Sequence, residues 1–180
     1  YRACDQSNGV IVGALATTDS GAASTSAYSA AVRNSGITVT SVNDAPSGTS
    51  ATITLAEDTS KTFSAADFGF TDAADSPANA LSAVIITTLP TAGSLTFNGT
   101  PVTVGQSIAV ANIGSLLFTP ASNANGLAYA SLGFKVQDDG GTANNGVNTS
   151  SSESTLSIDV TALYDAPVNT VPGAQTVAED

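Results

Sequence analysis

Short runs of alternating apolar and polar residues, separated by Gly, Pro and Asn, fill the chain from about residue 52 to residue 161. Alternation with a period of two is typical of β-strands that bury one face. It is strictest in Leu156–Val160, where Leu, Ile and Val alternate with Ser and Asp. The pattern predicts strands at 52–55, 81–87, 94–97, 102–104, 107–110, 115–119, 132–137 and 155–161.

Turn signals separate these predicted strands. The Asn98-Gly99 pair is a strong hairpin signal between the strands at 94–97 and 102–104. Ser64–Asp67 is predicted to form a single helical turn, and helical periodicity is convincing nowhere else. Eight short strands with turns between them predict an all-β chain folded as a β-sandwich.

One sequence pattern occurs twice in the chain. ITVTSVNDAP at 37–46 returns as IDVTALYDAP at 158–167, an offset of 158 − 37 = 121 residues. Further along, LAED at 55–58 returns as VAED at 177–180, an offset of 179 − 57 = 122 residues. A period near 120 residues suits one small domain repeated in tandem.

The repeat sets the expected domain boundaries. Residues 1–43 are the C-terminal strands of one repeat, 44–165 are a complete repeat, and 166–180 are the start of the next. Two strands alone are marginal in water and leave bare edges. Either the chain is an excerpt of a longer protein, or its end strands complete a sandwich in a neighbouring subunit.

The charge balance restricts the partners. Fifteen acidic and four basic residues give a net charge of −11, and charged residues make up 11% of the chain. Nucleic acid and anionic membranes both need a basic face, so neither is an expected partner. The sequence contains no apolar run long enough to span a membrane, so we expect no membrane insertion. The composition is typical of extracellular β-rich modules, for which cations are the natural partner.

The residue types argue against an enzyme. With no His and a single Cys, the usual nucleophile–base pairs and transition-metal ligand sets cannot form. A hydrolase using Asp138 and Asp139 is also disfavoured, because neighbours in a strand point to opposite faces. Cys4 is either a free thiol or a partner in an intermolecular disulfide.

Many of the acidic residues gather in four groups at predicted strand ends and loops. The groups are Asp67, Asp72 and Asp75; Asp138 and Asp139; Asn43 and Asp44; and Glu57 and Asp58. Ca²⁺ takes six to eight oxygen ligands from carboxylates, Asn side chains and backbone carbonyls, which converging loops can supply. Asp in turns also caps backbone N–H groups. The clustering favours a metal site over this alternative.

Several segments resemble a known family. Residues 71–80 look like the cadherin signature in which an Asp pair precedes an Asn, and 136–141 resemble the cadherin Asp-x-Gly turn. Residues 42–46 resemble the cadherin linker written Asx-Asn-Asp-Asn-Ala-Pro, and Glu57 stands where cadherins place the first-strand Glu. The chain is most similar to bacterial cadherin-like tandem repeats of large extracellular surface proteins and repeat-in-toxin adhesins. The resemblance implies an Ig-like, cadherin-like Greek-key sandwich with Ca²⁺ at the junctions between repeats.

The resemblance also implies the ligands. The junction before the complete repeat would use Asn43, Asp44, Asp72, Asp75 and Asn79, together with Asp138 or Asp139 from the late turn. The next junction, at the opposite end of the sandwich, would use Glu57 and Asp165. The second linker has Tyr164 where the first has Asn43. We therefore expect fewer or weaker ions at the second junction.

The expected function is a calcium-stiffened structural or adhesion repeat at the cell surface, with neighbouring repeats as partners. A first alternative is a subunit of an extracellular filament, in which identical subunits polymerise by strand donation. A second alternative is a carbohydrate-binding module with glycan or cell-surface targets.

Overall fold

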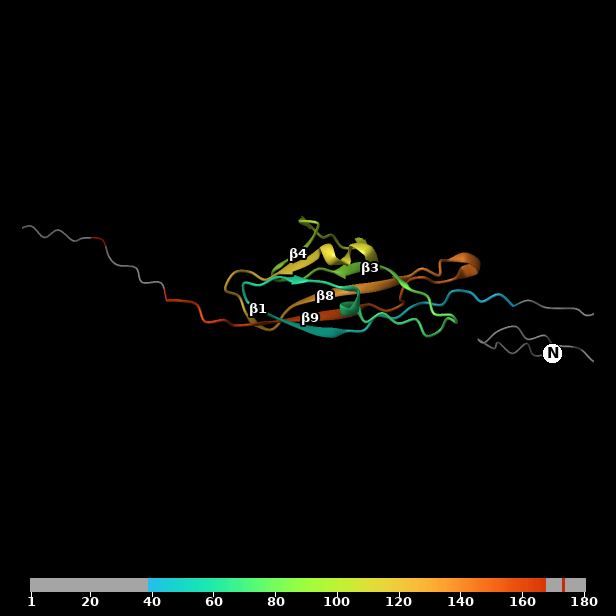
Figure 1. The fold of residues 1–180 in the computed structure, drawn as a ribbon, viewed down its shortest axis with the longest axis horizontal. Coiled ribbons are helices and arrows are strands. Elements are labelled where there is room, and N and C mark those ends of the chain that lie inside the picture. The colour runs from blue at the N-terminus through green and yellow to red at the C-terminus, as the bar shows by residue number, and fades with distance from the viewer. Residues whose placement is uncertain (1–38, 168–172, 174–180) are drawn as a thin grey trace, which may run out of the picture.

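The computed structural model describes residues 39–167 and residue 173 (Figure 1). This part of the chain is mostly β-strand, in two sheets. The strands are β1 (Ala51–Ala56), β2 (Lys61–Thr62), β3 (Leu81–Thr88), β4 (Ser94–Phe97), β5 (Thr100–Pro101), β6 (Ser107–Ala109), β7 (Leu116–Thr119), β8 (Gly126–Asp138) and β9 (Ser154–Thr161). The short 3-10 helices are η1 (Ala65–Phe68), η2 (Val110–Ser115) and η3 (Ala143–Asn145). Within the described residues, no helix is long and apolar enough to cross a membrane.

The strands alternate between the two sheets. One sheet has the order β1-β9-β8-β3-β6, and the other has the order β2-β7-β4-β5. β1 runs parallel to β9, with Leu55 opposite Val160, whereas the other strand pairs described are antiparallel. The chain passes from one sheet to the other after β1, β2, β3, β5, β6 and β7.

One hydrophobic cluster joins the sheets. The alternation at 156–160 is confirmed, because Leu156, Ile158 and Val160 are all buried. Phe68 lies between Phe63 and Phe134, with ring centroids 5.9 Å and 5.0 Å away. Phe63 extends the β2–β7 ladder and Phe134 belongs to β8, so these rings connect the two sheets. Large aromatic side chains contribute much of the apolar area buried in such a core.

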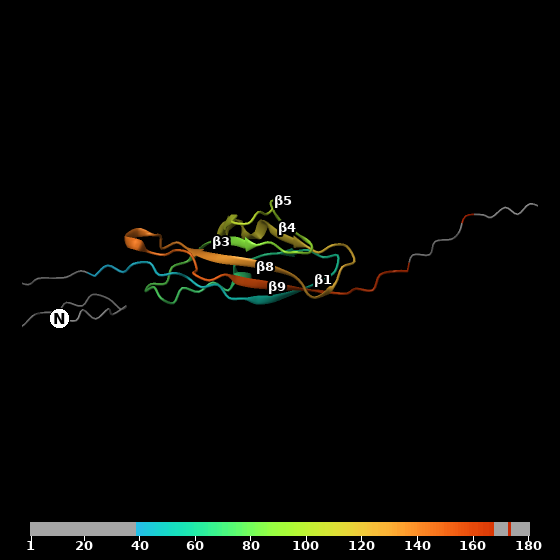
Figure 2. The same ribbon diagram turned by 180° about the vertical axis from the view of Figure 1, so that it is seen from behind.

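The chain enters the fold at one end and leaves at the other (Figures 1 and 2). At the N-terminal pole lie the incoming linker, the start of β3 and the end of β8. At the C-terminal pole lie the ends of β1 and β9 and the β7–β8 loop. Since β1 and β9 are parallel, both point their C-terminal ends to the same pole. Asp44 and Glu57 therefore lie at opposite poles.

Most of the predicted strands are present, and the Asn98-Gly99 hairpin is confirmed. Both turn residues have positive φ values of 50° and 76°, as a type I′ turn requires. The strand predicted at 102–104 is wrong, because pairing resumes directly after the turn at Thr100–Pro101. The chain then bends again at Gly105, whose φ is 84°.

Two other elements differ from the sequence prediction. β8 begins at Gly126, six residues before the predicted start at 132. β2 was not predicted, because two residues are too few to show alternation. The single turn predicted at Ser64–Asp67 is present as η1, displaced by one residue. Cys4 and most of the segments assigned to neighbouring repeats lie outside the described residues.

Asp67 stabilises η1 rather than a metal site. Its carboxylate accepts hydrogen bonds from the Ser64 backbone N–H (2.7 Å), the Ser64 hydroxyl (2.9 Å) and Lys61 Nζ (3.0 Å). Partial burial raises the pKa of Asp67, but the bonds from Lys61 and Ser64 and the Lys61 charge together lower it below its ordinary value.

We predict that Asp67→Ala lowers the free energy of unfolding at pH 7 by about 1 kcal/mol, the usual cost of losing a capping side chain. Because the pKa is lower in the folded state, this stability is present above the unfolded pKa. It is lost as the pH falls through the folded pKa. Urea unfolding of both proteins from pH 7 to pH 2 measures the effect. A difference in stability that is the same at every pH would contradict this account.

Candidate metal centre at the N-terminal pole

Chain segments far apart in sequence meet at the N-terminal pole. They are the linker residues Asn43 and Asp44, the loop 72–79 before β3, the turn 138–141 after β8, and Val147 beyond η3. The β3–β8 pairing places two of them side by side, since Leu81 stands opposite Asp138. The antiparallel register thus brings both acidic loops to one edge of the sheet.

Asn43 connects the linker to these loops. Its side-chain nitrogen lies 3.1 Å from Asp138 Oδ1, 3.0 Å from the Gly141 carbonyl and 2.9 Å from the Val147 carbonyl. Its side-chain oxygen accepts a hydrogen bond from Asn79 Nδ2, and its backbone carbonyl accepts one from Val147 N–H (2.8 Å). A primary amide has two hydrogens, so three acceptors around one nitrogen leave the site rich in oxygen.

The remaining predicted ligands of the first junction surround Asn43 and Asn79. Asp44 N–H donates to Asp75 Oδ2 (2.9 Å), and Asn79 Nδ2 is 3.3 Å from the same oxygen. The backbone N–H of Asn79 donates to Asp72 Oδ2 (2.6 Å). The structure therefore connects Asp75 and Asp138 through the two Asn side chains, and Asp72 through the backbone N–H of Asn79.

Asp139 has a separate position. Its Oδ1 accepts the Ala80 N–H (2.8 Å), and its own N–H donates to the Ala80 carbonyl (3.1 Å). These bonds close the turn onto the start of β3. Asp139 is exposed, so its side chain contributes less to the centre than that of Asp138.

Two buried carboxylate oxygens at this pole have no hydrogen-bond donor. Asp72 is 7% exposed and Asp138 is 2% exposed, and neither Asp72 Oδ1 nor Asp138 Oδ2 has a partner. Burying an ionised carboxylate without compensation is costly, so such groups are normally paired or bound to a metal. These two oxygens, with carbonyl oxygens nearby, fit the donor set of a hard cation such as Ca²⁺.

A cavity lies beside the site, and one wall of the site is tightly packed. The cavity has a volume of about 210 Å³ and is lined by linker residues 41–43, loop residues Asp75–Pro77 and Asn79, and Gly140, whereas Asp72 and Asp138 do not line it. A Cβ atom added at Gly140 would overlap Asn43 Oδ1 and Asn79 Nδ2. A side chain at position 140 would therefore separate the two Asn residues that hold the centre together.

The centre is not built from carboxylates alone. Within residues 39–167 and 173, no group of three or more His, Cys, Asp or Glu side chains is placed to hold a metal ion. A cation here would need Asn and backbone oxygens as well, which Ca²⁺ accepts. The sequence did not predict the carbonyls of Gly141 and Val147, because every residue has a backbone carbonyl and the residue type does not show which one faces the site.

The predicted ligands of the second junction form no such centre. Glu57 is 3% exposed, and both of its oxygens are hydrogen-bonded. Oε1 accepts the Leu163 N–H (2.5 Å) and Oε2 accepts Asn125 Nδ2 (2.9 Å). Asp165 is exposed. Neither belongs to a group of three acidic residues in the described part of the chain that could bind an ion.

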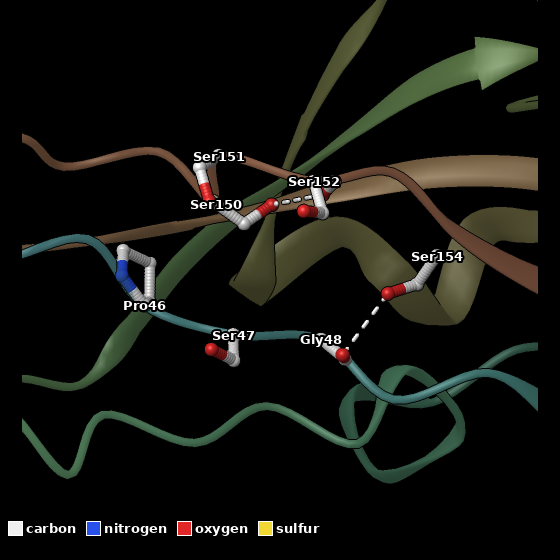
Figure 3. Close-up of a pocket in the computed structure, with 7 residues that line it drawn as sticks. All are labelled: Pro46, Ser47, Gly48, Ser150, Ser151, Ser152 and Ser154. Carbon is white, nitrogen blue, oxygen red and sulfur yellow. Dashed lines mark hydrogen bonds between the residues drawn. The ribbon is translucent and has the colours of Figure 1, made fainter.

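A second pocket lies beside the chain segment that precedes β1 (Figure 3). It has a volume of about 90 Å³ and is lined by residues 46–48 and by Ser150–Ser152 and Ser154. Ser154 Oγ donates to the Gly48 carbonyl (2.9 Å), and Ser150 Oγ donates to the Ser152 carbonyl (3.1 Å). This pocket has no charged lining residue and is far smaller than a typical ligand site of about 300 Å³ or more. It gives the glycan-binding alternative no support.

No family model matches the chain, and no match was found among curated proteins or solved structures. The functional argument therefore depends on the residues and their geometry.

We predict that Gly140→Ala destabilises the fold by about 1–3 kcal/mol, the usual cost of overpacking. The added methyl group would displace the side chains of Asn43 and Asn79. Gly114→Ala is the matched control, because a Cβ there meets no atom within 4 Å. Thermal unfolding of both variants measures the effect, and equal stability would show that the close packing at Gly140 has no energetic importance.

Proposed function

We propose that residues 44–165 are a calcium-stiffened structural repeat of an extracellular bacterial surface protein. The observation that carries this proposal is the pair of buried, unpartnered oxygens of Asp72 and Asp138 beside a linker residue. A cation bound there would join the linker to the module that follows it. Successive modules would then form a stiff rod.

The finer fold assignment is part of the proposal. The strands alternate between two sheets, and the first strand is parallel to the last. These features support a cadherin-like Greek-key sandwich, in which connections cross repeatedly from one sheet to the other. The entry of the chain at one pole and its departure at the other suit an end-to-end array (Figure 1).

Electrostatics favours a cation at the N-terminal pole. Asp44, Asp72, Asp75, Asp138 and Asp139 all lie there. The two basic residues of the described region bond elsewhere: Lys61 to Asp67 (3.0 Å) and Lys135 to the Ser151 carbonyl (3.0 Å). A bound cation would reduce the repulsion among the carboxylates. Ca²⁺ suits the mixed, irregular set of oxygens better than Mg²⁺, which demands near-ideal octahedral geometry.

We predict that calcium raises the thermal unfolding midpoint, measured against excess chelator. A ligand that binds only the folded state adds about 2.7 kcal/mol at one hundred times its dissociation constant. This corresponds to a shift of several degrees in a domain of this size. Asp72→Asn and Asp138→Asn should each abolish the shift while keeping the side-chain shape.

Glu153→Gln is the control, since Glu153 is an exposed carboxylate outside the centre. It should leave the calcium shift unchanged. If calcium does not move the midpoint of the unaltered chain, the acidic residues serve as turn caps and the proposed function is wrong.

A further inference from the structure

The C-terminal pole holds the outgoing chain through a buried carboxylate. Glu57 follows β1 directly, and its N–H donates to the Thr161 carbonyl (2.9 Å). Its side chain accepts the Leu163 N–H on one oxygen and the Asn125 amide on the other. Thr161 Oγ1 also lies 3.3 Å from the Leu55 carbonyl. The last residues attached to this module therefore extend to Leu163.

Tyr164, the residue after Leu163, occupies the position in the repeat at which the linker first bonds to the following module. Tyr164 matches Asn43 in the repeat, at the offset of 164 − 43 = 121 residues. Two backbone hydrogen bonds attach the linker at positions 43 and 44 to the module that follows. The Asn43 carbonyl accepts the Val147 N–H, and the Asp44 N–H donates to the Asp75 carboxylate. These two bonds use backbone groups of the linker, so the change from Asn to Tyr does not remove them.

We propose that Glu57 is a latch for the linker rather than a cation ligand, and that it forces neighbouring repeats to abut. Consecutive Cα atoms are about 3.8 Å apart. If Leu163 is attached to one module and Tyr164 to the next, no unattached residue lies between the two modules. The C-terminal pole is then an interaction surface whose partner is the N-terminal pole of the following repeat.

Exposed apolar side chains at this pole support an interface. Leu127 is 86% exposed, Leu163 is 53% exposed and Tyr164 is fully exposed. They belong to segments that meet at Glu57, through Asn125 and through Leu163 itself. Large apolar side chains exposed at the same end of a module are candidates for a contact with a neighbouring repeat. We call these three residues the C-terminal contact face.

The exposed position of Leu127 results from an irregularity in β8. The β8–β9 register shifts between Gly126 and Ala130, so β8 bulges there. Ala128 has a φ of 47°, a left-handed conformation that non-glycine residues avoid, and its N–H donates to Asp159 Oδ1 (2.7 Å). Strained backbone held by a specific bond is a feature of functional sites. Here it places Leu127 in solvent.

The N-terminal pole also exposes apolar side chains. Val147 is 48% exposed and is bonded to Asn43, and the exposed Pro77 lines a cavity with Asn43. A following repeat of the same design would present these positions to the C-terminal contact face. The inference uses the tandem arrangement of the proposed function, but it does not require a bound ion.

Amide hydrogen exchange of the 180-residue chain, followed by NMR, tests the latch. The Leu163 amide should exchange roughly 10- to 100-fold more slowly than the Tyr164 amide, as expected for a hydrogen bond to a charged acceptor. Glu57→Ala should remove this protection, whereas Glu57→Gln, which keeps an acceptor oxygen, and the exposed control Glu153→Ala should retain it.

The response to calcium distinguishes the proposed latch at Glu57 from the proposed metal centre. Protection of Leu163 should be the same with calcium and with chelator, because protein donors already bond to both Glu57 oxygens. If Leu163 exchanges freely, or becomes protected only with calcium, the latch is overturned. The metal centre could still stand in that case, since its signals come from Asp72 and Asp138 at the other pole.

The contact face is tested in a chain in which residues 1–165 are followed directly by residues 45–180. Leu127→Ser with Tyr164→Ser, made in the first repeat, should lower the unfolding midpoint of this two-repeat chain by several degrees. The same changes in the 180-residue chain should have little effect, because both side chains are exposed there. Equal effects in the two chains would overturn the proposed interface.

Discussion

Two carboxylates, Asp72 and Asp138, are buried at one end of the β-structure, and the loops of that end are arranged around them. Each keeps one oxygen without a donor. Hydrogen bonds to the other oxygen of each carboxylate offset part of the cost of burying the charge, and a bound cation would offset more of it. The same loops bind Asn43, so whatever compensates the charge also fixes the incoming chain. Stability and linker order are coupled through this one group of side chains.

The linkers at the two poles are attached by different side-chain groups. At the N-terminal pole an amide, Asn43, lies among more acceptors than it can satisfy, which leaves the site suited to a cation. At the C-terminal pole a carboxylate, Glu57, accepts a hydrogen bond from the protein on each of its two oxygens. The first attachment should therefore respond to calcium and the second should not. In a rod built from such modules, the attachment of the linker would be independent of calcium at the C-terminal pole of each repeat and dependent on calcium at the N-terminal pole.

The sequence predicted much of the fold, because strand alternation and the Asn98-Gly99 turn are local signals. β2 and the early start of β8 were missed, since they depend on pairing partners distant in sequence. For the site, the positions of acidic residues and Asn indicated the N-terminal cluster. They could not distinguish Glu57, whose donors are a backbone N–H and Asn125, from Asp72. Whether a carboxylate is free or satisfied depends on the folded surroundings and not on residue type.

The central claim is that calcium binds at the N-terminal pole. A calcium titration followed by amide chemical shifts tests it most directly. The account predicts saturable shifts with a single dissociation constant for Asp44, Asn79 and Gly140, whose amides bond to Asp75, Asp72 and Asp138. The Leu163 amide at the opposite pole should not shift. An absence of saturable shifts, or small shifts spread over all the acidic residues, would contradict the account.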